Sequence, residues 1–211
     1  MKIKVCGMTY RDNLEEVAAL KPDFLGFIFH QPSPRFMANT LSAADVRAID
    51  SSIKKVGVFV NEAVERVVQA GEEYGLDYAQ LHGHESVEHC RSVKAAGIKV
   101  IKVFPVVDSI DMSAVEAYND VCSAVLFDTK TDGYGGSGKA FDWTALETYS
   151  LDKPYFLSGG ISPENVRDIL CSSALKPWAL DVNSQFEDAP GRKNIELIKT
   201  LIQEVRDGVS R

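Results

Sequence analysis

The sequence predicts an α/β protein built as a single (β/α)8 barrel that spans residues 1–211. Three observations lead to this prediction: short apolar runs alternate with longer amphipathic runs, the alternation repeats eight times, and polar or glycine residues follow the apolar runs directly. The edge strands of an open sheet are expected to be polar or interrupted, and none of the eight runs has either property. A closed barrel is therefore favoured over a doubly wound sheet.

The eight apolar runs have the length and the β-branched or aromatic composition of buried parallel strands. They cover residues 3–5, 24–29, 55–60, 78–81, 100–104, 124–127, 155–157 and 178–182. Each is followed by a run with helical spacing of its apolar residues, over 12–20, 42–49, 62–74, 87–96, 112–121, 143–149, 164–171 and 195–205. These units use up the chain, so we expect no second domain.

The composition favours a small-molecule ligand. The formal net charge is -7 and no stretch is rich in Lys and Arg, so the basic patch that nucleic acid or an anionic membrane would require is missing. No apolar run reaches the length of a membrane span, and Gly7 interrupts the first run too early for a signal segment. We therefore expect a cytoplasmic protein. The four cysteines form no C-x-x-C pair, which argues against a zinc knuckle or a disulfide framework.

Polar and glycine residues collect where the predicted strands end. They include Cys6, Phe29, His30, Asn61, Gln80, His82, Pro105, Asp128, Ser158, Gly159, Gly160, Asp181, Asn183 and Ser184. In a barrel these strand ends form one mouth, where β/α barrels build active sites and where the last two loops commonly bind phosphate. The glycines of residues 133–138, after Asp128, would let the backbone approach a ligand closely.

Five groups of residues together resemble a known family. They are Lys4-Val-Cys-Gly-Met-Thr9; Gly26-Phe-Ile-Phe29 with Ser33-Pro-Arg35; Gln80-Leu-His-Gly83; Asp128-Thr-Lys130 with Gly135-Gly-Ser-Gly-Lys139 and Phe141-Asp-Trp143; and Ser158-Gly-Gly-Ile-Ser-Pro-Glu-Asn-Val166. From residue 2 to about residue 194, in this order and spacing, the chain resembles phosphoribosylanthranilate isomerase of tryptophan biosynthesis. The resemblance implies a single (β/α)8 barrel, in agreement with the count of units.

The resemblance also implies a reaction that uses neither a metal nor a cofactor. It is the Amadori rearrangement of N-(5'-phosphoribosyl)anthranilate to 1-(2-carboxyphenylamino)-1-deoxyribulose 5-phosphate, with Asp128 as general acid and Cys6 as general base. A free thiol titrates near ~8.5 and a free Asp near ~3.9. We therefore expect nearby positive charge to favour the Cys6 thiolate and an apolar pocket to raise the pKa of Asp128.

By the same resemblance, Arg35 pairs with the anthranilate carboxylate, Asp181 lies near the bridging amine or sugar hydroxyls, and His82 stacks or hydrogen-bonds in the mouth. The implied phosphate-binding residues are Gly136, Gly159, Gly160, Asn183 and Ser184. The family's Ser-Ser-Gly-Val-Glu reads Asn-Ser-Gln-Phe-Glu over residues 183–187, so Gln185 replaces a glycine that would help to hold the phosphate. Because Arg35 lies in a predicted loop, we expect its loss to weaken binding and to leave stability almost unchanged.

Other interpretations compete with this one. His82 and His84 could form a metal pair with Asp181, but a chain with four His has few imidazoles to complete a metal-dependent hydrolase. A barrel similar to indole-glycerol-phosphate synthase is disfavoured, because it would need a catalytic Lys/Glu set and an N-terminal extension, neither of which we expect in this chain. A non-catalytic sugar-phosphate-binding barrel is disfavoured by the presence of both Cys6 and Asp128. The expected partner is a phosphorylated aminosugar substrate, and the sequence leaves monomer and homodimer open.

Overall fold

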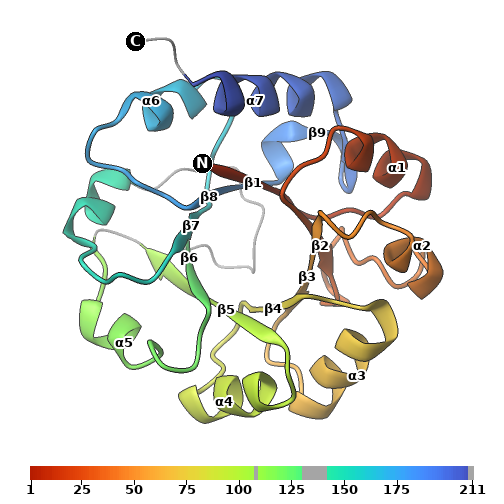
Figure 1. Cartoon of the computed structure of the whole chain (residues 1–211), viewed down its shortest axis with the longest axis horizontal. Coiled ribbons are helices and arrows are strands. Elements are labelled where there is room, and N and C mark those ends of the chain that lie inside the picture. The colour runs from red at the N-terminus through yellow and green to blue at the C-terminus, as the bar shows by residue number, and fades with distance from the viewer. Residues whose placement is uncertain (107–108, 130–141, 209–211) are drawn as a thin grey trace.

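The protein forms a closed barrel of eight parallel strands surrounded by helices (Figure 1). A computed structural model describes residues 1–106, 109–129 and 142–208. Neighbouring strands follow one another in chain order, and the first strand pairs in parallel with both the second and the eighth. The predicted (β/α)8 barrel is confirmed.

The barrel strands lie close to the predicted runs. They are β1 (Lys2–Val5), β2 (Phe24–Ile28), β3 (Lys54–Phe59), β4 (Tyr78–Leu81), β5 (Lys99–Val106), β6 (Ala124–Thr129), β7 (Tyr155–Leu157) and β8 (Ala179–Val182). The helices outside them are α1 (Arg11–Ala19), α2 (Ala43–Arg47), α3 (Val64–Tyr74), α4 (Val87–Ala95), α5 (Met112–Glu116), α6 (Val166–Cys171) and α7 (Ile195–Asp207).

Several predicted helices are too long because capping residues share the polar and apolar pattern of the helix itself. Of the predicted run 42–49, only residues 43–47 form the helix α2. Ser42 caps the N-terminus of this helix by accepting a hydrogen bond from the amide of Asp45. The helix α5 covers only residues 112–116 of the predicted run 112–121. The helix α6 begins at Val166, two residues after the predicted start at residue 164. The predicted sixth helix is a 3₁₀ helix, η1 (Trp143–Thr148). A short turn of this kind is common where no long amphipathic face exists to be buried.

A small substructure after β8 was not predicted. It consists of the 3₁₀ turn η2 (Ser184–Phe186) and an antiparallel pair, β9 (Glu187–Ala189) with β10 (Arg192–Lys193). Such two- and three-residue strands are too short to show an alternating pattern. They matter because they carry two charged side chains of the site described below.

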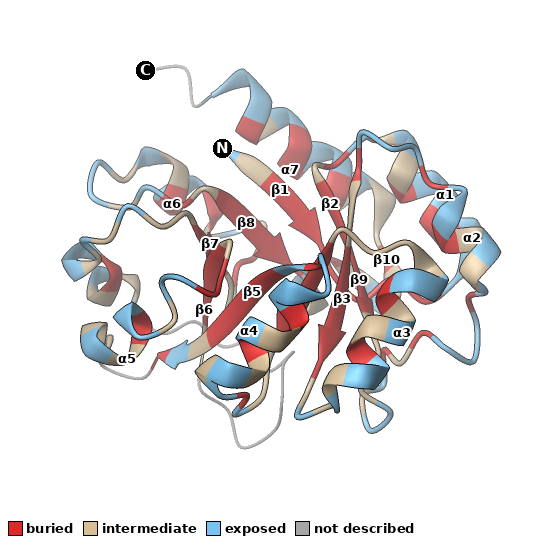
Figure 2. Ribbon diagram, turned by 60° about the horizontal axis from the view of Figure 1, so that its bottom comes forward, coloured by how far each residue is buried: buried red, intermediate tan, exposed pale blue. Residues whose placement is uncertain are grey.

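Side chains along each strand point alternately inward and outward, so the strands separate an apolar region inside the barrel from one beneath the helices. Inside the barrel, Phe24, Phe156 and Trp178 pack edge to face with ring centroids 5.2 to 5.4 Å apart. Side chains at the intervening positions pack outward against the helices, and Figure 2 shows that burial concentrates on the strands and on the inner faces of the helices. Within the described residues, no helix has the length and apolar character to cross a membrane.

The first strand places a charged side chain in this apolar interior. Ile3 and Val5 pack outward in the large cluster, so alternation turns Lys4 and Cys6 toward the barrel axis. Lys4 is completely buried, and its register partner on β8 is Asp181. A charge in this position requires an opposite charge beside it, because a buried unpaired ammonium is strongly disfavoured.

The aromatic cluster inside the barrel predicts a large stability effect. We expect Phe156→Ala to lower the free energy of unfolding by about 3–5 kcal/mol, as is typical for a fully buried phenylalanine. Urea denaturation followed by circular dichroism would measure it, with the exposed Glu65→Ala on α3 as the control. A loss no greater than the control's would show that the barrel interior tolerates the cavity.

Candidate active site

The mouth of the barrel contains a buried ion pair below the predicted base. Lys4 Nζ lies 2.9 Å from both carboxylate oxygens of Asp181, and their side chains are 0% and 5% exposed. The positive charge of the same ammonium acts on the Cys6 thiol. Although burial alone would lower it, the negative charges of Asp181 and Cys6 raise the pKa of Lys4. The ammonium therefore stays charged and faces the thiol.

The expected pKa shift of Cys6 is wrong in direction. Burial raises the pKa of the Cys6 thiol above its ordinary value, and the carboxylate of Asp181 raises it further. Lys4 and the more distant Lys193 act in the opposite direction and offset only part of this effect. The expectation considered cations alone, whereas the burial that brings Lys4 close also removes water from the thiolate.

Asp128 lies in a polar setting and not in the apolar pocket that the sequence suggested. One carboxylate oxygen, Oδ1, accepts a 2.9 Å hydrogen bond from the amide of Thr129. The other, Oδ2, lies 3.4 Å from Nε2 of His82. The imidazole is supported in turn by Gln80, whose Nε2 lies 3.3 Å from His82 Nδ1. The predicted acid and the predicted mouth histidine thus contact each other directly.

Asp181 interacts both with the charges around Cys6 and with the pair of Asp128 and His82. Its carboxylate interacts electrostatically with Asp128 and His82 on one side and with Lys4 on the other. It also acts on the Cys6 thiol. Cys6, Asp128, His82 and Asp181 are therefore brought together at one end of the barrel, as the sequence predicted.

Arg35 is buried, although it lies in the predicted loop after β2. Its Nη2 lies 2.7 Å and its Nε 3.0 Å from the carboxylate of Glu187, and the two side chains are 10% and 4% exposed. Its stem passes beside Gly7, where a Cβ atom would lie 2.8 Å from Arg35 Cδ. Because Arg35 fills a buried ion pair, the structure predicts that its loss would lower stability, in contrast to the expectation from the sequence.

A third charge completes this second cluster. Lys193 Nζ lies 2.5 Å from Glu187 and 2.7 Å from Oδ1 of Asn183. Burial lowers the pKa of Lys193 to about 8, with the positive charge of Arg35 adding to the effect and Glu187 opposing it. Although burial opposes the shift, Arg35 and Lys193 hold the pKa of Glu187 below its ordinary value. The cluster carries two cations around one carboxylate.

The turn after β7 has the backbone shape expected of an anion site. Gly159 and Gly160 have φ values of +85° and +69°, and a Cβ at Gly159 would lie 2.3 Å from Thr129 Oγ1. Within the described part of the chain, the amides of these two glycines make no hydrogen bond. The carbonyl of Gly160 is held by Asn165 Nδ2 at 2.8 Å, so the carbonyl is fixed while both amides remain available to a ligand.

The remaining phosphate candidates differ in how far the structure describes them. Gly136 lies outside the described residues. The side-chain oxygen of Asn183 accepts a hydrogen bond from Lys193. Ser184 begins η2 two residues after the end of β8, and β8 pairs with β7, the strand that the Gly159 turn follows. These positions stay predictions.

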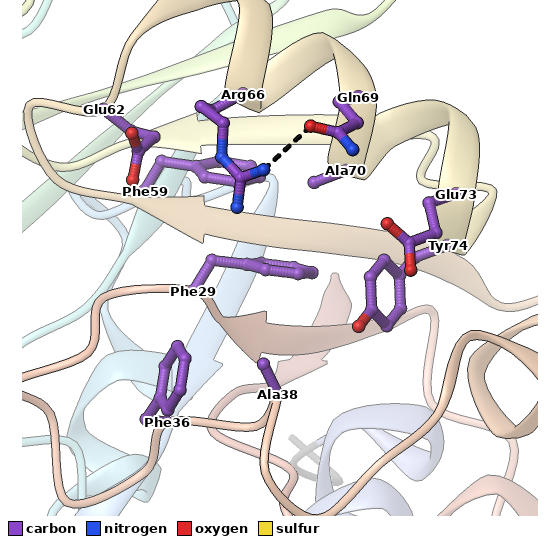
Figure 3. A pocket seen from close by; sticks show the side chains of 10 residues that line it. All are labelled: Phe29, Phe36, Ala38, Phe59, Glu62, Arg66, Gln69, Ala70, Glu73 and Tyr74. Carbon is purple, nitrogen blue, oxygen red and sulfur yellow. Dashed lines mark hydrogen bonds between the residues drawn. The ribbon is translucent and has the colours of Figure 1, made fainter.

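A separate pocket of about 130 Å³ lies on the outer side of the wall, between the loop after β2 and α3 (Figure 3). Phe29 and Phe59 stack 5.0 Å apart within it, and Arg66 donates a hydrogen bond to Gln69 at its rim. Its lining includes none of the predicted site residues. Among residues 1–106, 109–129 and 142–208, no three His, Cys, Asp or Glu side chains are arranged to hold a metal ion.

Known proteins match the chain over almost its whole length. The family model for N-(5'phosphoribosyl)anthranilate (PRA) isomerase matches residues 3–204. The chain belongs to the PRA isomerase family. It is 43% identical to N-(5'-phosphoribosyl)anthranilate isomerase of Parabacteroides distasonis over 208 residues, which cover 97% of this chain and 93% of that protein. Membership in the family makes the chain an isomerase of tryptophan biosynthesis.

Solved structures of PRA isomerases share the fold. The phosphoribosyl anthranilate isomerase of Thermus thermophilus superimposes with a TM-score of 0.87 at 33% identity, covering 98% of this chain and 99% of that one. A second phosphoribosyl anthranilate isomerase, solved in complex with reduced 1-(o-carboxyphenylamino)-1-deoxyribulose 5-phosphate, matches with a TM-score of 0.82 at 32% identity and the same coverage.

Sequence reasoning missed the charged residues that support the predicted site. Lys4 could have been found, because it stands two residues before Cys6 on a strand and must point to the same side. Glu187 and Lys193 lie more than 150 residues from Arg35 in the chain, and no local pattern relates them to it. Only the folded barrel brings these charges together.

The position of Asp181 predicts how the Cys6 thiol titrates. Since the carboxylate raises the pKa of the thiol, we expect Asp181→Asn to move thiolate formation to lower pH. Ultraviolet absorbance of the thiolate would measure this, after subtraction of matched Cys6→Ser spectra to remove the other three cysteines. Asp12→Asn, at an exposed position, is the control. An unchanged or higher pKa in Asp181→Asn would mean that another group governs the thiol.

Proposed function

We propose that this PRA isomerase carries out an Amadori rearrangement with Asp128 as general acid and Cys6 as general base. The substrate is N-(5'-phosphoribosyl)anthranilate, and the product is 1-(2-carboxyphenylamino)-1-deoxyribulose 5-phosphate. The observation that carries the proposal is that one end of the barrel holds both the ion pair of Lys4 with Asp181, beside Cys6, and the contact of His82 with Asp128. The relative that was solved with a reduced form of this product supports the choice of ligand.

Asp128 acts first. Its carboxyl proton passes to the furanose ring oxygen, the bond from that oxygen to C1′ breaks, and the lone pair of the anthranilate nitrogen closes a Schiff base at C1′. The contact between His82 Nε2 and Asp128 Oδ2 supports this role, because it holds one oxygen of the acid in place. The amide of Thr129 holds the other oxygen.

Cys6 acts second. Its thiolate takes the proton from C2′, the electron pair moves to form the C1′–C2′ double bond, and the Schiff base becomes an enolamine. Tautomerisation then gives the ketone. Substrate and product are isomers, so the reaction consumes no oxidant or reductant. A raised pKa makes the Cys6 thiolate scarce near neutral pH but a stronger base, and the neighbouring ammonium of Lys4 stabilises it.

Arg35 binds the anthranilate carboxylate through the edge of its guanidinium that Glu187 leaves open. Glu187 occupies Nε and Nη2, and within the described residues Nη1 donates no hydrogen bond. An arginine fixed along one edge presents the other in a defined direction, which suits a planar carboxylate. The free amides of Gly159 and Gly160 support a phosphate site on the opposite loop.

Three expectations from the sequence remain part of the proposal. Residues 1–211 form a single domain, the protein is cytoplasmic, and it is a monomer or a homodimer. Analytical ultracentrifugation would distinguish the two assembly states. The proposed reaction requires neither a metal nor a cofactor, because the two proton transfers need only an acid and a base.

We expect Cys6→Ala and Asp128→Asn each to lower kcat by about 10²- to 10⁴-fold, the usual contribution of a positioned proton-transfer group. Cys6→Ser should be equally inactive, because a hydroxyl supplies almost no anion near neutral pH. The loss of anthranilate-type fluorescence with freshly prepared substrate would measure turnover. The matched control is Cys171→Ser, which changes the exposed cysteine and should keep full activity. A folded Cys6→Ala enzyme with full activity would remove Cys6 as the base.

The Arg35 proposal makes a separate prediction. Arg35→Met should lower kcat/KM by about 10- to 100-fold, mainly through KM, since a charge-assisted contact contributes about 1.5–3 kcal/mol. It should also destabilise the fold by about 3–5 kcal/mol, because Glu187 loses a buried partner. Arg11→Met removes the same charge from an exposed pair and should change neither quantity. Unaltered KM in folded Arg35→Met would separate Arg35 from substrate binding.

A further inference from the structure

A further buried ion pair lies outside the barrel wall and contacts none of the proposed catalytic groups. Lys102 Nζ lies 3.0 Å from Glu85 Oε2, and the two side chains are 4% and 1% exposed. Lys102 alternates on β5 with Ile101 and Val103, which belong to the inner cluster, so it points outward toward α4. Replacing a buried ion pair by apolar residues is often neutral or stabilising. Stability alone therefore does not explain this pair.

The ammonium of Lys102 binds the backbone on both sides of His82. Nζ donates to the carbonyl of Leu81 at 3.1 Å and to the carbonyl of Gly83 at 2.7 Å. With the bond to Glu85, these contacts use all three N–H donors of the lysine. Two peptide groups that flank one mouth residue are thus fixed to a single buried atom.

Glu85 holds the same turn from the opposite direction. Its carboxylate accepts the amide of Gly83 at 2.9 Å and the amide of Asn61 at 2.8 Å. Asn61 follows β3, so the carboxylate joins the turn after β4 to the loop beside it. The amide of His82 is bound to the carbonyl of Phe59 at 2.8 Å. The backbone from residue 81 to 83 therefore has little freedom to shift.

The imidazole in the middle of this turn depends on that rigidity. His82 Nε2 and Asp128 Oδ2 are 3.4 Å apart, and His82 Nδ1 and Gln80 Nε2 are 3.3 Å apart. Both distances exceed the usual range of about 2.7–3.2 Å for hydrogen bonds, so a small backbone displacement would break either contact. Positioned catalytic groups generally require placement to within about 0.5 Å.

We propose that Lys102 and Glu85 form a positioning pair, which acts through the backbone of residues 81–83 to hold His82 against Asp128. This proposal rests on the proposed role of Asp128 as the acid. The two residues lie behind the wall and touch neither substrate nor reacting atoms. Their effect should fall on kcat, because the acid acts in the chemical step. KM should change little, because Arg35 and the Gly159 turn lie on other loops.

The first test is Lys102→Met, which keeps the length of the side chain and removes its donors. We expect kcat to fall by about 10- to 100-fold, as misplacement of a catalytic group commonly causes, with KM altered less than about threefold. In nitrogen-15 spectra, the imidazole signals of His82 should shift while those of His89, on α4, stay in place. An unshifted His82 imidazole together with unchanged kcat would overturn the proposal.

A double variant separates positioning from stability. Lys102→Met leaves the Glu85 carboxylate buried and unpaired, whereas Lys102→Met with Glu85→Leu removes both charges and should recover stability. We expect kcat to stay low in the double variant, because the carbonyls of Leu81 and Gly83 remain unbound. Recovery of kcat together with stability would show that the pair serves the fold alone, and would overturn the proposal.

The matched control is Val93→Ala on α4. Val93 is fully buried in the same outer cluster but lies away from the turn after β4, so it should lose stability and keep kcat. The failures of the two proposals are also distinct. Full activity in Asp128→Asn would overturn the proposed acid, whereas full activity in Lys102→Met with an inactive Asp128→Asn would overturn the positioning pair alone.

Discussion

The ion pair of Lys4 and Asp181 is the interaction on which the rest of the mouth depends. The two residues are register partners on the first and last strands, so their bond lies across the seam where the barrel closes. Breaking a buried pair by removing one partner typically costs about 3–5 kcal/mol. Because Cys6 follows on the same face of β1, the contact that joins the strands also sets the surroundings of the proposed base.

The fold could be predicted because its signals are local. Eight apolar runs and the helical spacing between them can be counted without knowing which strand meets which, and the right-handed β-α connection leaves few alternatives. The residues of the site were predictable to the same extent, since Cys6, His82, Asp128 and Asp181 all stand at strand ends. What failed was the local form of short segments, such as η1 and the pair β9 and β10, where two to six residues show no period.

The environments of these residues were not predictable, because they depend on groups far apart in the chain. Arg35 lies in a predicted loop, yet it is buried against Glu187, which is 152 positions away in the chain. Cys6 was expected to have a lowered pKa because cations were considered without the burial that accompanies them. Burial acts on the thiolate and on the ammonium together, so the same desolvation that strengthens their attraction also disfavours each charge. Sequence reveals which charges exist, but not how much water surrounds them.

The proposed active site therefore depends on charges buried at three places around the strand ends. The pairs of Lys4 with Asp181, Lys193 with Glu187, and Lys102 with Glu85 each place an ammonium beside a carboxylate with almost no exposure. Loops at a barrel mouth expose backbone groups that neither strand nor helix can satisfy, and a lysine buried behind the loop supplies donors on a long stem. Apolar residues of the same volume in place of Lys102 and Glu85 would favour stability but would leave the carbonyls of Leu81 and Gly83 unbound. The pair of Lys102 with Glu85 thus exchanges some of the stability that an apolar core would give for a fixed position of the loop that carries His82.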